Sequence, residues 1–85
     1  MRVTVRYFAS LREQVGCSRE EVDLPGEAST VGALRARLQA RGAGWAVALA
    51  EGKPLRMAVN MDMAPAGAAI KAGDEIAFFP PVTGG

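Results

Sequence analysis

Few side chains in this sequence have the types and spacing that catalysis or metal binding requires. The 85 residues include one cysteine and no histidine, so a Ser-His or Cys-His nucleophile pair cannot form and the commonest metal ligand is missing. The sequence also has no Cys-x-x-Cys or His-Glu-x-x-His motif and no glycine-rich phosphate loop. We therefore expect no metal site and no cofactor bound by this chain.

Two remaining candidates for side-chain chemistry have plainer interpretations. Asp74 and Glu75 are adjacent, but neighbours on a strand point to opposite faces, so we interpret them as solvated turn charges rather than an acid–base pair. Cys17 lies beside Ser18 and Arg19, and a cationic neighbour lowers the pKa of a thiol. A reactive Cys17 is thus an alternative to an inert one, although the chain offers it no second cysteine.

The most distinctive chemical group is the carboxylate at the end of the chain. The tail comprises Pro80, Pro81, Val82, Thr83, Gly84 and Gly85, none of which has a charged side chain. The two prolines favour a semi-rigid, extended backbone, and six extended residues span at most about 20 Å. Gly84 and Gly85 have no Cβ, so they can enter a slot too narrow for a side chain. The alternative is an ordinary frayed terminus.

A terminal carboxylate can carry another group only after it has been activated. Its pKa is about 3.5, so it is ionised at neutral pH and resists nucleophiles. Adenylation would activate it, but this chain has no phosphate loop of its own. We therefore expect a partner enzyme to bind ATP and to catalyse the activation of Gly85.

Hydrophobic alternation and helical spacing predict the elements that must position this tail. Period-two alternation predicts strands over Arg2–Ala9, Arg19–Leu24, Arg56–Met61 and Glu75–Phe79. The clearest helix is predicted to begin after an N-cap at Thr30 and to stop at Gly42. Val31, Leu34 and Leu38 would form its buried apolar stripe. Arg35 is expected to lie mostly outside this stripe. Ser10 is expected to cap a short helical turn that ends at Gly16. Residues 45–49 are apolar but of uncertain type, and residues 62–73 read as loops with at most a short strand.

The same alternation places two phenylalanines on the outer face of the sheet. If Val3, Val5 and Tyr7 face the core, Phe8 faces the other way, and Phe79 likewise lies on the face opposite Phe78. Two exposed aromatic residues on a small sheet indicate a surface for a partner. The alternative is that a bulge or the end of a strand turns them inward.

The order of elements predicts an α+β fold in which a mixed sheet packs around one main helix, the arrangement of the ubiquitin-like β-grasp. We expect a β-grasp domain over residues 1–79 and an extended tail over residues 80–85. The net charge of +1 does not indicate a nucleic-acid or membrane-surface partner. With no signal peptide and no apolar run near 18 residues, we expect a cytoplasmic protein.

Five stretches of the sequence resemble the small-subunit family of molybdopterin synthase, a group of ubiquitin-like sulfur carriers. These stretches are RYFASLRE at 6–13, TVGALRARL at 30–38, WAVALAEGK at 45–53, AVN at 58–60 and GDEIAFFPPVTGG at 73–85. The resemblance covers nearly the whole chain. Its most specific part is the last thirteen residues, because other sulfur carriers share the two terminal glycines without the Phe-Phe-Pro-Pro run.

The resemblance implies a role that the residues alone do not establish. Gly85 would be adenylated by an enzyme of the ubiquitin-activating type and converted to a thiocarboxylate. The large catalytic subunit, in a two-plus-two heterotetramer, would then receive the tail and pass sulfur to cyclic pyranopterin monophosphate to form the molybdopterin dithiolene. Phe8, Phe79 and Met63 would dock on that subunit. Two alternatives stay open: a modifier conjugated to lysines, as ubiquitin is, and a carrier for thiamine synthesis or tRNA thiolation.

Overall fold

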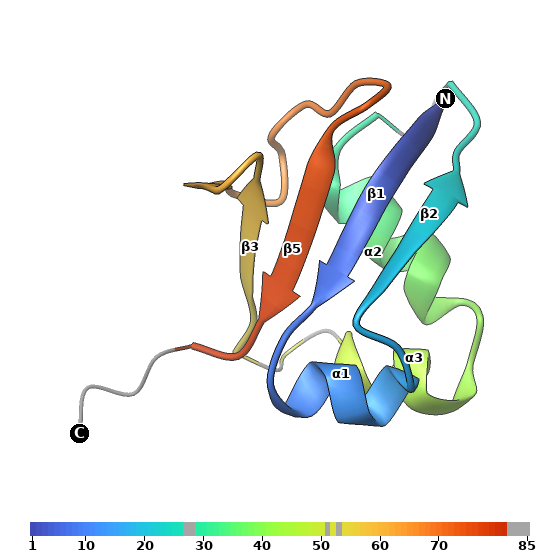
Figure 1. Cartoon of the computed structure of the whole chain (residues 1–85), viewed down its shortest axis with the longest axis vertical. Coiled ribbons are helices and arrows are strands. Elements are labelled where there is room, and N and C mark those ends of the chain that lie inside the picture. Colours follow the sequence, from blue (N-terminus) through green and yellow to red (C-terminus); the bar gives the residue numbers. More distant parts are fainter. Residues whose placement is uncertain (27–28, 51, 53, 82–85) are drawn as a thin grey trace.

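The sheet of this protein is centred on a parallel pair made by its first and last strands. The structure is a computed structural model that describes residues 1–26, 29–50, 52 and 54–81. Its strands are β1 (Arg2–Tyr7), β2 (Arg19–Asp23), β3 (Arg56–Val59), β4 (Asp62–Met63) and β5 (Glu75–Phe79), in the spatial order β2-β1-β5-β3-β4 (Figure 1). β1 and β5 are parallel, whereas β1–β2, β3–β5 and β3–β4 are antiparallel.

Helices cover one face of this sheet and one of its ends. α2 (Val31–Gln39) lies behind β1 and β2 in Figure 1, and α1 (Ser10–Val15) and α3 (Ala43–Ala48) lie at the end where β1 and β5 finish. The predicted α+β arrangement, a mixed sheet around one main helix, is confirmed. The apolar stretch of uncertain type is α3, and the short strand allowed within residues 62–73 is β4.

The core forms between the inner face of the sheet and α2. The alternation predicted for β1 is confirmed, because Val3, Val5 and Tyr7 are at most 1% exposed. Val31, Leu34 and Leu38 of α2 and Ile76 and Phe78 of β5 are equally buried. The rings of Tyr7 and Phe78 stack with centroids 6.3 Å apart. Burial of these apolar side chains is the main stabilising term.

The main helix begins as predicted, but one of its arginines is not where we expected it. The Thr30 side chain accepts a hydrogen bond from the Ala33 N–H at 3.1 Å, which satisfies one of the unpaired donors of the first turn. The prediction that Arg35 lies mostly outside the buried stripe is wrong. Arg35 is buried and donates to the carbonyl oxygens of Leu49 at 2.9 Å and Ala50 at 2.7 Å. A helix end leaves carbonyls without partners, and Arg35 satisfies them at the end of α3.

The boundaries of the other two helices differ slightly from the predictions. Ser10 is the first residue of α1 and not its cap, because Ala9 occupies the N-cap with φ 53° and makes no side-chain cap bond. Gly16 ends α1 in the left-handed conformation, as predicted. α2 ends before Gly42, which has φ 78° and is the N-cap of α3. The glycine therefore turns the chain from one helix into the next.

The predicted strand Arg56–Met61 is too long by two residues. β3 ends at Val59, and Asn60 and Met61 form a two-residue turn into β4 with φ 49° and 73°. Positive φ at both central residues is the geometry of a type I′ hairpin. Met61 is consequently 90% exposed instead of sharing the inward face of Met57.

Replacing Gly44 with alanine is expected to destabilise the protein by about 3 kcal/mol. A Cβ at Gly44 would collide with the backbone carbonyl of Gln14 in α1, and backbone atoms cannot rotate away as a side chain can. Urea unfolding of Gly44→Ala measures the loss. Gly67→Ala is the matched control, because no atom lies within 4 Å of its added Cβ. Equal stability of the two variants would contradict the close approach of α1 and α3.

Candidate functional site

The outer face of the sheet carries two aromatic residues that lie against each other. Phe8 is 38% exposed and Phe79 is half-buried, and their rings meet edge to face with centroids 6.4 Å apart. They are brought together because β1 and β5 are parallel, and the Phe8 N–H donates to the Phe78 carbonyl at 3.1 Å. The predicted outward direction of both phenylalanines is therefore confirmed, and the bulge alternative is not needed.

Met63 belongs to the same face of the sheet. Arg6 pairs in register with Ala77, Ala77 with Ala58, and Ala58 with Met63. Paired residues of neighbouring strands share a face, so Met63, which is 59% exposed, lies on the outer face one row from Phe79. We call Phe8, Phe79 and Met63, with the two small alanines between them, the apolar patch. A contiguous patch of this kind is typical of a partner surface.

Arg6 makes one border of the apolar patch. Its guanidinium carbon lies 4.9 Å from the centroid of the Phe8 ring, within the range of a cation–π interaction. The same guanidinium lies 3.7 Å from the Glu75 carboxylate. Glu75 thus helps to hold the Arg6 side chain over Phe8. The charge of Arg6 at this border of the apolar patch is partly neutralised by the Glu75 carboxylate.

Asp74 and Glu75 do not form an acid–base pair, but the interpretation of Asp74 as a solvated charge is wrong. Asp74 is 5% exposed and accepts hydrogen bonds from the Lys71 N–H at 2.9 Å and from Asn60 Nδ2 at 3.0 Å. The hydrogen bonds from Asn60 and from the Lys71 backbone hold the pKa of this carboxyl below its usual range. Asp74 therefore ties the turn before β5 to the β3–β4 hairpin, a structural role.

The structure favours an inert Cys17 over a reactive one. Burial raises the pKa of the thiol, and the carboxylate of Glu20 raises it further, against a smaller opposing effect of Arg41. The thiolate is the nucleophilic form, so a raised pKa lowers reactivity at neutral pH.

The tail begins where the apolar patch ends. Pro80 and Pro81 follow β5 directly and are half-buried, so the chain leaves the sheet beside Phe79. The other predicted tail residues, Val82, Thr83, Gly84 and Gly85, lie outside the described residues, and so does the carboxylate of Gly85. Their roles stay predictions.

The described part of the chain offers neither a cluster of metal ligands nor a membrane-spanning helix. Among residues 1–26, 29–50, 52 and 54–81, no three His, Cys, Asp or Glu side chains gather in a way that would hold a metal ion. No helix there is both long enough and apolar enough to cross a membrane.

One residue next to the apolar patch was not singled out from the sequence. Arg56 pairs in register with Phe79 across the β3–β5 ladder, and its side chain is exposed. Alternation does place Arg56 opposite the inward Met57, but only the strand register shows that it neighbours Phe79. The missing information was which strands pair, a non-local property.

Comparisons with known proteins show the family to which this chain belongs. The protein-family model described as the ThiS family matches residues 5–85. The molybdopterin synthase sulfur carrier subunit of Haemophilus influenzae is 45% identical over 83 residues, which cover 98% of this chain and 99% of that protein.

Solved structures give the same picture of the fold. Small archaeal modifier protein 1 of Haloferax volcanii superposes with a TM-score of 0.75 at 33% identity, and the match covers 95% of this chain and 98% of that one. A chain from the complex of subunits 1 and 2 of the molybdopterin-converting factor of Helicobacter pylori superposes with a TM-score of 0.68 at 28% identity, with full coverage of both. The predicted ubiquitin-like β-grasp is confirmed. Because the family model spans most of the chain and a curated relative is 45% identical over nearly its whole length, the chain belongs to the ThiS family.

Proposed function

We propose that this chain is the sulfur carrier subunit of a molybdopterin synthase. The observation that carries the proposal is the identity of 45%, over nearly the whole chain, with a protein named for that role. The Helicobacter pylori structure supports it, because there a similar chain is part of a complex of two subunits. As a carrier, the chain is not an enzyme by itself, and catalytic side chains belong to the large subunit. The proposal includes a cytoplasmic location.

In this proposal the reacting group is the carboxylate of Gly85. A partner enzyme of the ubiquitin-activating type joins the carboxylate to the AMP portion of ATP and releases pyrophosphate. A sulfur donor then displaces AMP, and the C-terminus becomes a thiocarboxylate. Activation is required because an ionised carboxylate is a poor electrophile, and the absence of a phosphate loop from the sequence assigns ATP binding to the partner.

In this proposal the chain docks on the large subunit and positions the C-terminal carboxylate in its active site. Residues 1–79 are the domain that docks, and residues 80–85 are the tail that reaches the active site of the large subunit. Pro80 and Pro81 stiffen the base of the tail, Val82 and Thr83 extend it, and Gly84 gives clearance in a narrow channel. Stiffness lowers the entropy lost when the tail is ordered on binding.

The apolar patch is the surface that would dock on the large subunit. Phe8 and Phe79 pack against each other next to the start of the tail, so a partner that covers them is placed where the tail leaves the domain. Two copies of each subunit would make the synthase, and sulfur would pass from the thiocarboxylate of Gly85 to cyclic pyranopterin monophosphate.

Intact-mass measurement tests the proposal. After incubation with the activating enzyme, ATP and a sulfur donor, the chain is expected to gain the mass difference between one sulfur and one oxygen atom. Deletion of Gly84 and Gly85 is expected to abolish the gain. If the wild-type mass does not change, or if the deleted chain gains the same mass, the proposal is wrong.

A second candidate function is a protein modifier joined to lysines. It is favoured by the likeness to small archaeal modifier protein 1 at 33% identity, and the same activated carboxylate would serve it. Lysine-linked adducts of this chain in cell extracts would support this function. A carrier for thiamine synthesis or tRNA thiolation would be distinguished by its partner, since it would bind a thiazole synthase or a tRNA-thiolating enzyme in place of the large subunit.

A further inference from the structure

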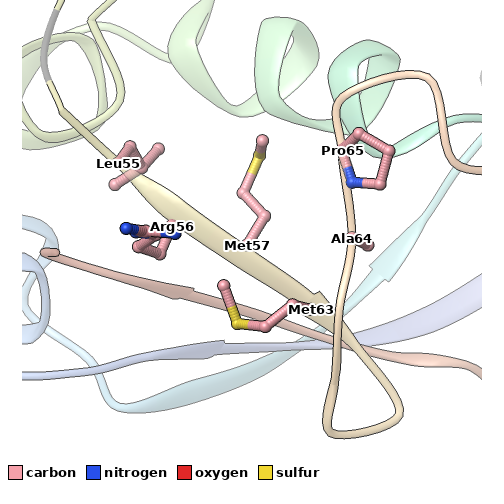
Figure 2. Close-up of a pocket in the computed structure, with 6 residues that line it drawn as sticks. All are labelled: Leu55, Arg56, Met57, Met63, Ala64 and Pro65. Atoms are coloured by element: carbon pink, nitrogen blue, oxygen red, sulfur yellow. The ribbon is translucent and has the colours of Figure 1, made fainter. Parts of the chain in front are cut away.

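A pocket of about 370 Å³ opens at the edge of β3. Its walls come from two segments, one entering β3 and one leaving β4, and the lining residues are Leu55, Arg56, Met57, Met63, Ala64 and Pro65 (Figure 2). All of these side chains are apolar except the guanidinium of Arg56. The pocket therefore combines a single positive charge with apolar side chains, and it is open to solvent.

The pocket exists because the β3–β4 ladder stops early. The Ala64 N–H donates to the Met57 carbonyl at 2.9 Å. Because hydrogen-bonded pairs alternate in an antiparallel ladder, the next donor toward β3 would be Ala66. Beyond that point the chain turns away from β3, and the Gly32 N–H of α2 bonds to the Ala66 carbonyl at 2.7 Å. The edge at Leu55 is left without a neighbouring strand among the described residues.

The pocket is continuous with the apolar patch. Met63 belongs to both, because it lines the pocket and ends the row that contains Ala58 and Ala77. Arg56 also lies between the pocket and the apolar patch, since it lines the pocket and pairs in register with Phe79. A partner that covers Phe79 and Met63 must therefore lie over the mouth of the pocket.

Arg56 differs from the two arginines of β1. Arg2 and Arg6 lie within 4.0 Å of carboxylates on neighbouring strands. Within the described residues no carboxylate lies that close to Arg56, and its side chain is exposed. An arginine beside an apolar surface is suited to an interface ion pair, because its guanidinium is weakly hydrated and binds carboxylates through two parallel hydrogen bonds.

We propose that the partner that covers the apolar patch places an aspartate or glutamate side chain in this pocket, where it pairs with Arg56. This inference rests on the proposed function, in which that partner is the large synthase subunit. Charge pairs at the rim of an interface act mainly on the association rate, so Arg56 steers the approach of the partner while the phenylalanines supply most of the affinity.

Association kinetics with the large subunit from the same organism test the inference. Arg56→Glu is expected to slow association about tenfold at low salt. The difference from wild type should shrink as salt rises from about 0.01 M to 1 M, because the Debye length falls from about 30 Å to 3 Å. Arg37→Glu is the matched control: it makes the same change in net charge on an exposed position of α2. Replacing the partner's acidic residue with arginine should restore fast binding to Arg56→Glu.

The outcomes separate this inference from the proposed function. If wild type binds and Phe79→Asp does not, but Arg56→Glu associates as fast as wild type or no slower than Arg37→Glu, the inference is wrong and the proposed function stands. If wild type does not bind the large subunit at all, the proposed function is wrong. The isolated chain could also form dimers, and Arg56→Glu could dissociate them. The group in the pocket would then come from a second copy of this chain, and the inference would be wrong. Equal melting temperatures of the two variants exclude unfolding as the cause.

Discussion

Adding one residue after Gly85 is expected to abolish sulfur transfer and to leave the fold unchanged. In the proposed function the reacting group is the terminal carboxylate, so an added residue both converts it into an unreactive peptide bond and moves the new carboxylate past the catalytic position. A displacement of about 3.5 Å, the length of one extended residue, is larger than the tolerance of a reacting geometry. Molybdopterin formation with the large subunit measures the loss, and a circular dichroism spectrum measures the fold.

A removable extension provides the control for this experiment. If the extra residues follow a protease site that leaves Gly85 at the end, cleavage is expected to restore full activity to the same preparation. An extended chain that is fully active, and that mass spectrometry finds untrimmed, would contradict the assignment of Gly85 as the carrier of sulfur.

Replacing Phe79 with aspartate is expected to weaken binding to the large subunit by at least about 2 kcal/mol, or about 30-fold. Phe79 is half-buried and lies edge to face with Phe8 on the outer face of the sheet, where aromatic residues commonly dominate interface energy. The new carboxylate would have to be desolvated in an apolar contact. The thermal stability should change much less, because the core side of β5 is formed by Ile76 and Phe78.

Two control variants test whether the effect of Phe79→Asp comes from lost binding or from unfolding. Val47→Asp makes an equivalent apolar-to-acid change at a residue of α3 that is 53% exposed, and it is expected to leave partner binding intact. Phe78→Asp is expected to unfold the protein, because Phe78 is completely buried. If Phe79→Asp unfolds the chain as Phe78→Asp does, Phe79 is a core residue and the apolar patch is not a docking surface.

Local patterns were sufficient for the positions of the main strands and for their inward and outward faces, but not for where each strand ends. A period of two is visible within a few residues, so the inward positions of β1 and β5 and the outward positions of Phe8 and Phe79 followed from the sequence. The cap at Thr30 followed in the same way, because an N-cap bond joins residues three apart. The length of β3 did not, since nothing local requires Met61 to adopt a positive φ.

Long-range contacts account for the predictions that were wrong. Arg35 looked solvated because its partners, the carbonyls at the end of α3, belong to a helix that the sequence did not predict. Asp74 looked solvated because its partner Asn60 lies 14 residues away, in the turn between β3 and β4. Arg56 was missed as a neighbour of Phe79 for the same reason. The chemistry proposed for the tail rests on its composition alone, whereas the apolar patch beside it could be found only from the register of the sheet.

The parallel pairing of β1 with β5 has a consequence for how the protein is made. Thr4 pairs with Glu75 and Tyr7 with Phe78, so the centre of the sheet joins segments from opposite ends of the described chain. A nascent chain still lacking β5 can pair β1 only with β2, and it has neither the Tyr7–Phe78 stack nor the Phe8–Phe79 contact. Pairings this distant in sequence form late and slowly. An unfinished chain therefore cannot form the apolar patch, and only a molecule translated through its last strand has this surface complete.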